Sequence, residues 1–539
     1  MRGVRGGLGM GIWSLVASVS LLAGNASANE PLRPDPLDRP ARLIINWDEQ
    51  SLWRSQLTML QRANKPLTAE VVRSVLVEAA DAHARAGIDR MVYCCWARFE
   101  SPSPGFRTAP YESRIREISP GFGPLHDSGQ EQIQILMDRC HRHGMQFLLC
   151  LRMNDRHGIA RKAKFYLEHP ELRLDGYPGG LDYKHEKVRS KVLAFIAEAL
   201  ERYNVDGIEL DYLRWCHVFE PQDATKNAHL LTDMTRKARR LIDAAAKKRG
   251  RKKLLLTVRV PQTLAECRKL GFDIKTWIGE GLVDAVCPSD FFFADFNIAV
   301  EKYVALCRGT NCKVYPTIHP MIQVNHPDNI EPQHYRALAR GFYRSGAAGV
   351  STYNYQYNWR RWTGGTRGLV DGWPRTLGWL TELKNPPGLE PKSRQYLFYP
   401  LWQIFSESGA VKYQRILMAR SEAGKVETIM VRIHETNPQP QRDLVMRCKV
   451  LGLDAGENIS LSINGHTIPA ESIRRQHDKD GQSPQEGRPC GPFTMYEFPL
   501  KHEWLKEGDN VLGGQITRQA GGKKDVVAKD FELDVRPRT

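Results

Sequence analysis

Asn204-Val-Asp-Gly-Ile-Glu-Leu-Asp-Tyr-Leu-Arg214 is the stretch that decides the fold of this 539-residue chain. Its apolar residues predict a buried β-strand, and Gly207 would permit close packing. Because strand side chains alternate, Glu209 and Asp211 should point to one side and the apolar residues to the other. Two carboxylates on one face of a buried strand are costly unless they are paired or used. An amphipathic helix before the strand and a basic helix after it are typical of a barrel active site.

The same alternation of strands and helices extends over residues 41–385. Strands are predicted at 42–47, 89–96, 145–154, 204–214, 253–260, 283–289, 313–318 and 348–355, and helices at 68–86, 130–143, 186–203, 224–248, 274–280, 296–307, 333–345 and 374–384. Eight such units predict an α/β fold, a (β/α)8 TIM barrel. The longest connections, 97–127 and 155–185, follow strands and therefore belong to the catalytic end of the barrel.

The chain changes character after the barrel. A Pro- and Gly-rich stretch predicts a linker or domain edge at 386–410. Short alternating runs separated by turn residues then predict an all-β sandwich-like accessory domain at 411–539. Two roles stay open for it, carbohydrate binding and a packing or spacer function.

The first 28 residues have the pattern of a secretory signal peptide. Arg2 and Arg5 precede an apolar run at 12–23, and small residues at 26–28 predict cleavage after Ala28. The alternative is a membrane anchor, but the run is short and rich in Gly and Ser. We therefore expect a secreted or periplasmic protein without an integral membrane segment in the mature chain.

The composition restricts the partners. The 77 basic and 61 acidic residues give a net charge of +16, which suits anionic polymers such as acidic polysaccharide, or only non-specific adhesion to them. We find no nucleic-acid motif, no metal-ligand spacing and no cofactor motif, so no nucleic acid, metal or cofactor is expected. The eleven Cys form no disulfide framework, although Cys307 with Cys312, or Cys448 with Cys490, could pair.

Three short motifs carry a family resemblance. His169-Pro-Glu171, then Leu181-Asp182 with Val188-Arg189, then Val205 to Arg214 resemble the glycosyl-hydrolase-like family ten. That family has an HPE loop, an LD…VR helix start and a DGIHxDYIRYP strand in this order. The layout of 41–385 fits the resemblance, and the motifs lie within 165–215. It implies a secreted or periplasmic barrel that acts on glycan, including bacterial cell-wall glycan strands.

The match has departures. Glu209 replaces the usual His of the family, and Trp215-Cys216 replaces the terminal Tyr-Pro. The strand also resembles the DGxDxDxE strand of family-eighteen chitinases. Leu213, however, stands where that family has its proton-donating Glu, which disfavours a substrate-assisted mechanism.

Glycoside cleavage needs a proton donor and a second carboxylate, roughly 5–9.5 Å apart. Asp211 is the better candidate for the acid because it lies nearer the carboxyl end of the strand. Its partner should come from another strand, and Asp290 is our first choice, with Asp155 and Glu100 behind it. Glu209 is the other candidate for the second carboxylate. Asp290 could equally cap the segment that follows it.

The surroundings of Glu209 suggest a different role. Alternation predicts that Arg152, Asn154 and Arg259 share its inward face. Two flanking guanidinium groups would keep Glu209 ionised, which suits an orienting role better than proton donation. The alternative is an Arg-Glu-Arg layer that only holds the barrel together.

Strand ends also carry residues suited to sugar binding, since aromatic rings offer flat apolar faces and polar groups fix hydrogen bonds. The predicted substrate-binding residues are Trp47, Asp48, Trp96, Arg98, Asn154, Arg214, His319, Tyr353 and Tyr355. The sequence thus predicts an exported glycoside hydrolase that cleaves glycosidic bonds in a polysaccharide such as a cell-wall glycan. The alternative is a non-catalytic polysaccharide-binding protein on a hydrolase fold.

Overall fold

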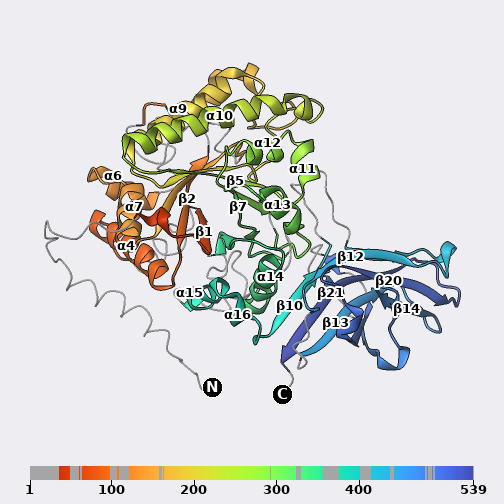
Figure 1. Ribbon diagram of the computed structural model, residues 1–539. Helices are drawn as coiled ribbons and strands as arrows, with labels where there is room; N and C mark the ends of the chain where they lie inside the picture. Colours follow the sequence, from red (N-terminus) through yellow and green to blue (C-terminus); the bar gives the residue numbers. More distant parts are fainter. Residues whose placement is uncertain are drawn as a thin grey trace.

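The computed structural model shows a barrel of parallel strands wrapped by helices, beside an all-β region (Figure 1). It describes residues 35–48, 60, 64–97, 106–108, 120–156, 161, 163–291, 293–322, 329–355, 375–400, 414–436, 442–479, 482–483, 488–489 and 492–537. The predicted signal peptide lies outside the described residues, and so do Arg98, Glu100 and Cys490.

The barrel is closed. Its strands are β1 (Leu43–Asp48), β2 (Arg90–Ala97), β3 (Gln146–Arg152), β4 (Gly207–Asp211), β5 (Leu255–Pro261), β6 (Ala285–Ser289), β7 (Lys313–Val314), β8 (Thr317–Ile318) and β9 (Val350–Tyr353). The hydrogen-bonded order runs β5-β4-β3-β2-β1-β9-β8-β6, and β6 pairs again with β5. Since β7 and β8 are two halves of the seventh strand, the predicted eight-stranded parallel barrel is confirmed.

The seventh strand is interrupted at Tyr315-Pro316, although the sequence predicts one strand over 313–318. Proline has no N–H to donate to a neighbouring strand. The chain still bridges its neighbours here, because the Tyr315 amide donates to the Val286 carbonyl at 3.0 Å and the Pro316 carbonyl accepts from the Ser351 amide at 3.0 Å.

Strand alternation divides the apolar residues into two layers. Ile44, Cys94 and Leu148 belong to a small cluster inside the barrel, and odd-numbered β1 residues such as Leu43 pack in the larger core under the helices. The predicted close packing at Gly207 is present, because a Cβ there would lie 2.3 Å from the Leu255 carbonyl oxygen. The outer core between strands and helices therefore buries most of the apolar surface.

The helices follow the strands as predicted. They are α4 (Ala69–Arg85), α6 (Gly123–Asp127), α7 (Gln132–Arg142), α8 (Lys164–Glu168), α9 (Glu186–Arg202), α10 (Ala224–Lys248), α11 (Leu264–Lys269), α12 (Ile274–Gly279), α13 (Val300–Cys307), α14 (Pro332–Arg344), α15 (Arg375–Leu380) and α16 (Pro386–Leu389). Thr68 caps α4 by accepting from the Val71 amide at 3.2 Å. The helix predicted at 374–384 changes to a 3-10 turn at 381–384, and the short helices α6, α8, α11 and α16 were missed. Within the described residues no helix is long and apolar enough to cross a bilayer.

The C-terminal region is built of antiparallel strands. They are β10 (Arg394–Phe398), β11 (Arg415–Met418), β12 (Glu427–Ile433), β13 (Arg442–Leu451), β14 (Asn458–Ile463), β15 (His466–Thr467), β16 (Arg474–Asp478), β17 (Gln482–Ser483), β18 (Arg488–Pro489), β19 (Phe493–Leu500), β20 (Gly508–Arg518) and β21 (Val526–Pro537). One sheet contains β10, β21, β13, β19 and β16, with β11 beside β21, and a second contains β12, β20, β14 and β15. A Cβ on Gly514 of β20 would lie 3.1 Å from Ile416 of β11, so the two sheets meet face to face as predicted. Strand β10 falls within the stretch 386–410, for which a linker was predicted.

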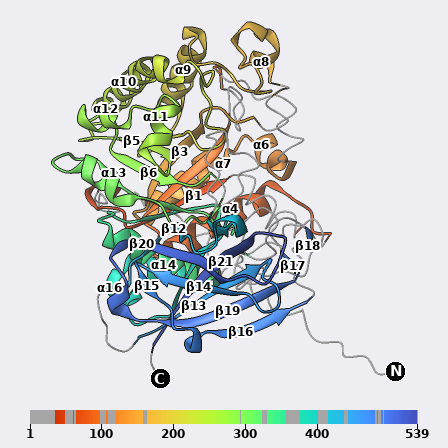
Figure 2. The same cartoon turned by 90° about the vertical axis from the view of Figure 1, so that its right-hand side faces the viewer.

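The barrel and the β region contact each other through α13, α14 and β10 (Figures 1 and 2). Arg432 of β12 forms a two-pronged ion pair with Glu301 of α13, at 2.6 and 2.9 Å. The Phe296 ring lies 6.0 Å from the Tyr396 ring of β10. These apolar and ionic contacts fix the β region against the outside of the barrel wall.

The cysteines are free thiols wherever their side chains are described. Cys307 lies at the end of α13 and Cys312 just before β7, and the neighbouring Cys312 side chain lowers the pKa of Cys307. Cys448 is buried in β13, and its suggested partner lies outside the described residues.

Candidate active site

Charged side chains gather where the barrel strands end. Asp48 ends β1, Arg152 ends β3, Asp211 ends β4 and Tyr353 ends β9, while Arg259 lies near the end of β5. The carboxyl ends of parallel strands meet at one end of a barrel, which is where barrel enzymes place their catalytic groups. We refer to these five residues as the mouth network.

Asp211 is held by three hydrogen bonds. Arg259 donates from Nε to Oδ1 at 2.9 Å and from Nη2 to Oδ2 at 3.0 Å, and the Leu213 amide donates to Oδ1 at 2.9 Å. The carboxylate is fully buried. Because both oxygens act as acceptors, this arrangement suits a nucleophile or base better than the proton donor that the sequence predicted.

Glu209 lies inside the barrel on the same strand, where β1, β4 and β5 bring their inward side chains together. Asn46 Nδ2 donates to its Oε1 at 2.5 Å, and Thr257 Oγ1 donates to its Oε2 at 3.0 Å. Burial, and then the negative charge of Asp211, raise the pKa of Glu209 from 4.5 to about 7, against the opposing charge of Arg259. The prediction that flanking arginines keep Glu209 ionised is therefore wrong.

The reason is that the side chains of Arg259 and Arg152 are both directed towards partners other than Glu209. Arg259 gives its hydrogen bonds to Asp211, as described above, and Arg152 points the other way. Arg152 Nη2 donates to Asp48 Oδ2 at 2.8 Å and to the Tyr353 hydroxyl at 2.9 Å, and its Nη1 donates to Asp155 Oδ2 at 3.3 Å. Alternation placed both arginines on the inward face correctly, but it could not tell which carboxylate each would reach.

Tyr353 lies between the two arginines. The Arg259 guanidinium carbon is 4.0 Å from the centre of its ring, and Arg152 donates to its hydroxyl. Burial raises the pKa of Tyr353, against the positive charges of Arg152 and Arg214. The structure thus brings Asp48, Asp211 and Tyr353, all predicted site residues, into one network.

Two further predicted residues lie at the same end. Asp290 follows β6 and is fully buried, and its Oδ1 accepts from the Phe293 amide at 2.8 Å. This is the capping contact foreseen as the alternative, so Asp290 has a structural function whether or not it is catalytic. The His319 ring lies 4.6 Å from the Tyr353 ring. Burial and the positive charge of Arg259 hold the pKa of His319 well below its usual value, so its imidazole is neutral at pH 7.

The side chains of Trp47 and Tyr355 do not join the mouth network. The Trp47 ring is buried against the rings of His83 on α4 and Tyr93, at 5.0 and 6.4 Å. The Tyr355 hydroxyl lies 2.5 Å from His83 Nε2, which accepts because Nδ1 donates to the Ala79 carbonyl at 2.6 Å. Both side chains therefore belong to the core between barrel and helices, not to a sugar-binding surface.

Asn154 has a structural position. Its Nδ2 donates to the carbonyls of Leu181 and His217, at 3.0 and 2.6 Å, and its Oδ1 accepts from the Leu181 amide at 3.0 Å. These bonds tie the connection after β3 to the connection after β4. The Trp96 side chain and Arg98 lie outside the described residues.

The sequence analysis missed Asn46 and Thr257, whose side chains donate hydrogen bonds to Glu209. A signal was available, because both are polar residues at inward positions of β1 and β5, next to the apolar Ile44 and Leu255 of the same parity. Polar residues at inward positions of a barrel usually pair with other polar groups.

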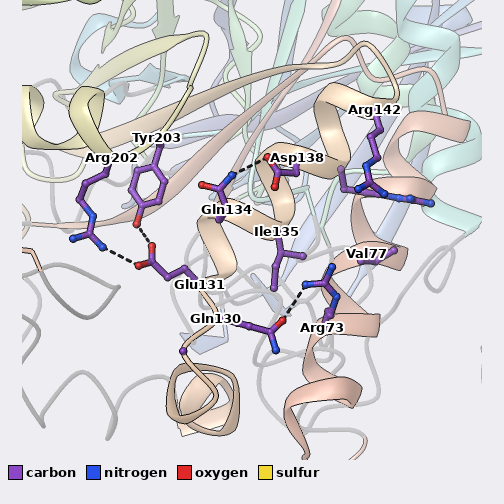
Figure 3. Close-up of a pocket in the computed structure, with 12 residues that line it drawn as sticks. Arg73, Val77, Gln130, Glu131, Gln134, Ile135, Asp138, Arg142, Arg202 and Tyr203 are labelled. Atoms are coloured by element: carbon purple, nitrogen blue, oxygen red, sulfur yellow. Dashed lines mark hydrogen bonds and ion pairs between the residues drawn. The ribbon is translucent and has the colours of Figure 1, made fainter. Parts of the chain in front are cut away.

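A surface cavity of about 610 Å³ lies elsewhere, between α4, α7 and the end of α9 (Figure 3). Its polar side chains bond to one another, as Arg73 does to Gln130 at 2.9 Å and Gln134 to Asp138 at 2.8 Å. Glu131 likewise accepts from Arg202 at 2.8 Å. This cavity is a solvated groove on the outer wall, away from the mouth network. Among the described residues, no three His, Cys, Asp or Glu side chains form a group that could hold a metal ion.

Fold and site define a (β/α)8-barrel protein with a mouth rich in arginine and carboxylate. No protein-family model matches the sequence, and no curated protein matches it. The chain is similar in structure to a GH138 enzyme targeting pectin rhamnogalacturonan II, with 10% identity, a TM-score of 0.41, and coverage of 65% of this chain and 39% of that one. It is also similar to the PgaB glycoside hydrolase domain from Bordetella bronchiseptica, with 11% identity, a TM-score of 0.36, and coverage of 59% and 95%.

The similarity extends beyond glycan-active proteins. Tryptophan synthase from Mycobacterium tuberculosis matches with 14% identity and a TM-score of 0.31, over 65% of this chain and 93% of that one. The chain spans well under half the length of the GH138 enzyme. Such distant similarity describes the fold alone, so the function has to be argued from the site.

Proposed function

We propose that the protein is a glycoside hydrolase that cleaves glycosidic bonds in a polysaccharide by carboxylate catalysis. The observation that carries this proposal is the pair on β4. Asp211 accepts from Arg259 with both oxygens, and Glu209, two residues before it, has a pKa raised to about 7. A buried carboxylate whose pKa is raised towards neutral pH, on the same strand as a second carboxylate at the catalytic end of a barrel, is typical of acid–base sites.

The geometry supports a division of roles. Asp211 acts as the nucleophile or base, because its oxygens are oriented acceptors. Asp290, from the end of β6, is the candidate proton donor, because a scissile bond needs its second carboxylate on another side. The pKa of Glu209 is raised to about 7, so below that pH its proton removes a second negative charge from the neighbourhood of Asp211.

The test is release of reducing ends by the chain without its first 28 residues, from a panel of polysaccharides that includes intact and denuded peptidoglycan. We expect one polymer to be cleaved, and Asp211→Asn to lower kcat by about 10²–10⁴-fold. Asp290→Asn should lower it on the same polymer. If Asp290 only caps its loop, this variant will lose stability without a specific loss of kcat.

A second variant separates chemistry from folding, because Asp211→Asn also removes a buried ion pair. Asp211→Gly opens space for an external nucleophile, and azide or formate should restore turnover in it. A purely structural Asp211 would give variants that lose stability and activity together, with no rescue by either anion.

The alternative function is a polysaccharide-binding protein without activity. The observation that favours it is that both β4 carboxylates already have hydrogen-bond partners within the chain. Such a protein would retain a polymer in a pull-down without releasing reducing ends, and Asp211→Asn would leave that retention unchanged.

We also propose export to the periplasm or the medium, on the pattern of the first 28 residues. The check is the N-terminal sequence of the protein recovered from each cell fraction. A start at Asn29 in the exported fraction agrees with the proposal, and intracellular protein that still begins at Met1 contradicts it.

A further inference from the structure

Two further arginines lie just past the strands that carry the candidate site, Arg156 after β3 and Arg214 after β4. The guanidinium carbon of Arg156 is 4.9 Å from the centre of the Tyr177 ring and 5.9 Å from that of Trp215. The guanidinium carbon of Arg214 is 5.3 Å from the Trp215 ring and 5.9 Å from the Phe291 ring. Trp215 therefore stands between two cations, and we call these five residues the arginine–aromatic cluster.

The backbone around the cluster is specialised. Trp215 has φ of +74°, a left-handed conformation that is strained for a non-glycine residue. Arg156 is enclosed along its stem, because a Cβ on Gly180 would lie 3.4 Å from its Cδ and 2.9 Å from Leu174. Arg156, Arg214 and Trp215 are each half-buried, so the cluster is fixed and still reaches solvent.

The cluster adjoins the candidate active site. The positive charge of Arg214, after burial and Arg259, helps to lower the pKa of His319, whose ring packs on Tyr353 of the mouth network. Burial lowers the pKa of Arg156 to about 10, which keeps its charge at neutral pH. An anion beside these residues would therefore lie within reach of the reacting end of the barrel.

The chemistry of the cluster is that of oxyanion recognition. The planar N–H fork of a guanidinium matches the geometry of a carboxylate or phosphate, and stacking on aromatic rings reduces the entropy lost on binding. The net charge of +16 attracts the same class of polymer over longer distances.

We propose that the arginine–aromatic cluster binds an anionic group on the glycan, a sugar carboxylate as in a uronic acid, and so selects an acidic polysaccharide as substrate. This proposal rests on the proposed function and names the substrate class of the same site. A sugar phosphate shares the oxyanion chemistry and is distinguished in the test.

The test measures binding and not turnover, so that a failure of hydrolysis does not decide it. Affinity electrophoresis or sedimentation would compare polygalacturonate and alginate with the same polymers after reduction of their carboxylates, and with a polyribitol phosphate. We expect tight binding to at least one carboxylated polymer, weakened about 10-fold or more in Arg156→Gln and Arg214→Gln. Reduction of the carboxylates should weaken binding of the unsubstituted chain by a similar factor and remove the difference between variants.

The matched control is Lys248→Gln, which removes the same charge from the end of α10, at the opposite end of the barrel. Melting temperatures confirm that each variant folds. The proposal is overturned if carboxylated and reduced polymers bind equally, or if Lys248→Gln weakens binding as much as the cluster variants, since that would mean general charge attraction. Variant-sensitive binding to polyribitol phosphate alone would overturn the carboxylate assignment in favour of a phosphate-bearing glycan.

Discussion

The molecule buries two glutamates in contrasting ways, one between the barrel and the β region and one inside the barrel. Glu435, at the first position, accepts from Arg394 Nε and Nη2 at 2.8 and 2.7 Å and from the Tyr396 hydroxyl at 2.9 Å. Arg340 of α14 lies 3.9 Å away, so cations from the barrel and from β10 converge on one carboxylate. This is an ion-pair network that holds two parts of the chain in one arrangement.

Glu209, in contrast, is buried among neutral hydrogen-bond partners. Its hydrogen bonds come from the neutral side chains of Asn46 and Thr257, while Arg259 is engaged with Asp211. Without a hydrogen-bonded cation, burial dominates and the pKa rises to about 7. The comparison shows what marks a candidate active site in this protein. It is not burial of charge as such, but a buried carboxylate that can change its protonation state near physiological pH.

The largest effect should come from breaking the ion-pair network. Glu435→Ala leaves Arg394 buried without its carboxylate, whereas Arg340 keeps its ion pair with Glu390 at 3.0 Å, and we expect the substitution to lower the free energy of unfolding by about 3–5 kcal/mol. Denaturant unfolding measures this. Glu78→Ala, which removes an exposed ion pair with Arg85, is the control and should cost about 0–1 kcal/mol. Equal effects in the two variants would show that the network contributes no more than a surface pair.

The next effect concerns the pH dependence of stability. The pKa of Glu209 is about 7 in the folded state against 4.5 as its ordinary value, so the folded state binds the proton more tightly than the unfolded state. Its contribution to stability must therefore fall as the pH rises from about 4.5 to about 7, by about 3 kcal/mol in all. Glu209→Gln removes this contribution. The free energy of unfolding of the variant, relative to the unsubstituted chain, should rise over that interval and stay level above it. A flat difference would mean that Glu209 does not titrate there.

A third substitution tests directly the hydrogen bond that the neutral Thr257 side chain donates to Glu209. Thr257 lowers the pKa of Glu209 by donating to the ionised carboxylate. Thr257→Val removes that donor with almost no change of shape, and a hydrogen bond to a charged group is worth about 1.5–3 kcal/mol. We therefore expect the upper end of the pH range over which the free energy of unfolding changes to move up by about one pH unit. The same series of unfolding measurements at different pH values tests this. A limit that stays in place would contradict the assigned hydrogen bond.

Much of the fold could be predicted from the sequence. Helix 224–248 and the inward face of β4 follow from apolar periodicity, which is a local property. The pairing of charges inside the barrel is not local. Arg259 and Arg152 each had a choice of carboxylates on neighbouring strands, and only the strand register and side-chain rotamers decide that Arg259 takes Asp211.

The aromatic residues at strand ends show the same limit of prediction from the sequence. Trp47 has the parity of Leu43 in β1, and alternation alone would have assigned it to the helix side. Tyr353 and Tyr355 are two residues apart and should face the same way in a regular strand. They do not, because β9 ends at Tyr353 and Asn354 adopts φ of +49°, which turns Tyr355 towards His83. The sequence gives no clear signal for that left-handed residue.

Tyr353 and Tyr355 provide the prediction with the smallest expected effect and the most selective test. Tyr355→Phe removes a hydroxyl that lies 2.5 Å from His83 Nε2 in the helix-side core, so we expect it to cost about 1 kcal/mol in unfolding free energy and to leave KM and kcat unchanged. Tyr353→Phe removes one of the two acceptors of Arg152 Nη2 in the mouth network, while Asp48 remains, and should lower kcat. Steady-state kinetics on the cleaved polymer, beside thermal unfolding, separates the two. A loss of activity in Tyr355→Phe that matches Tyr353→Phe would place both hydroxyls in the site. Our division of the strand-end aromatics into core and mouth residues would then have to be abandoned.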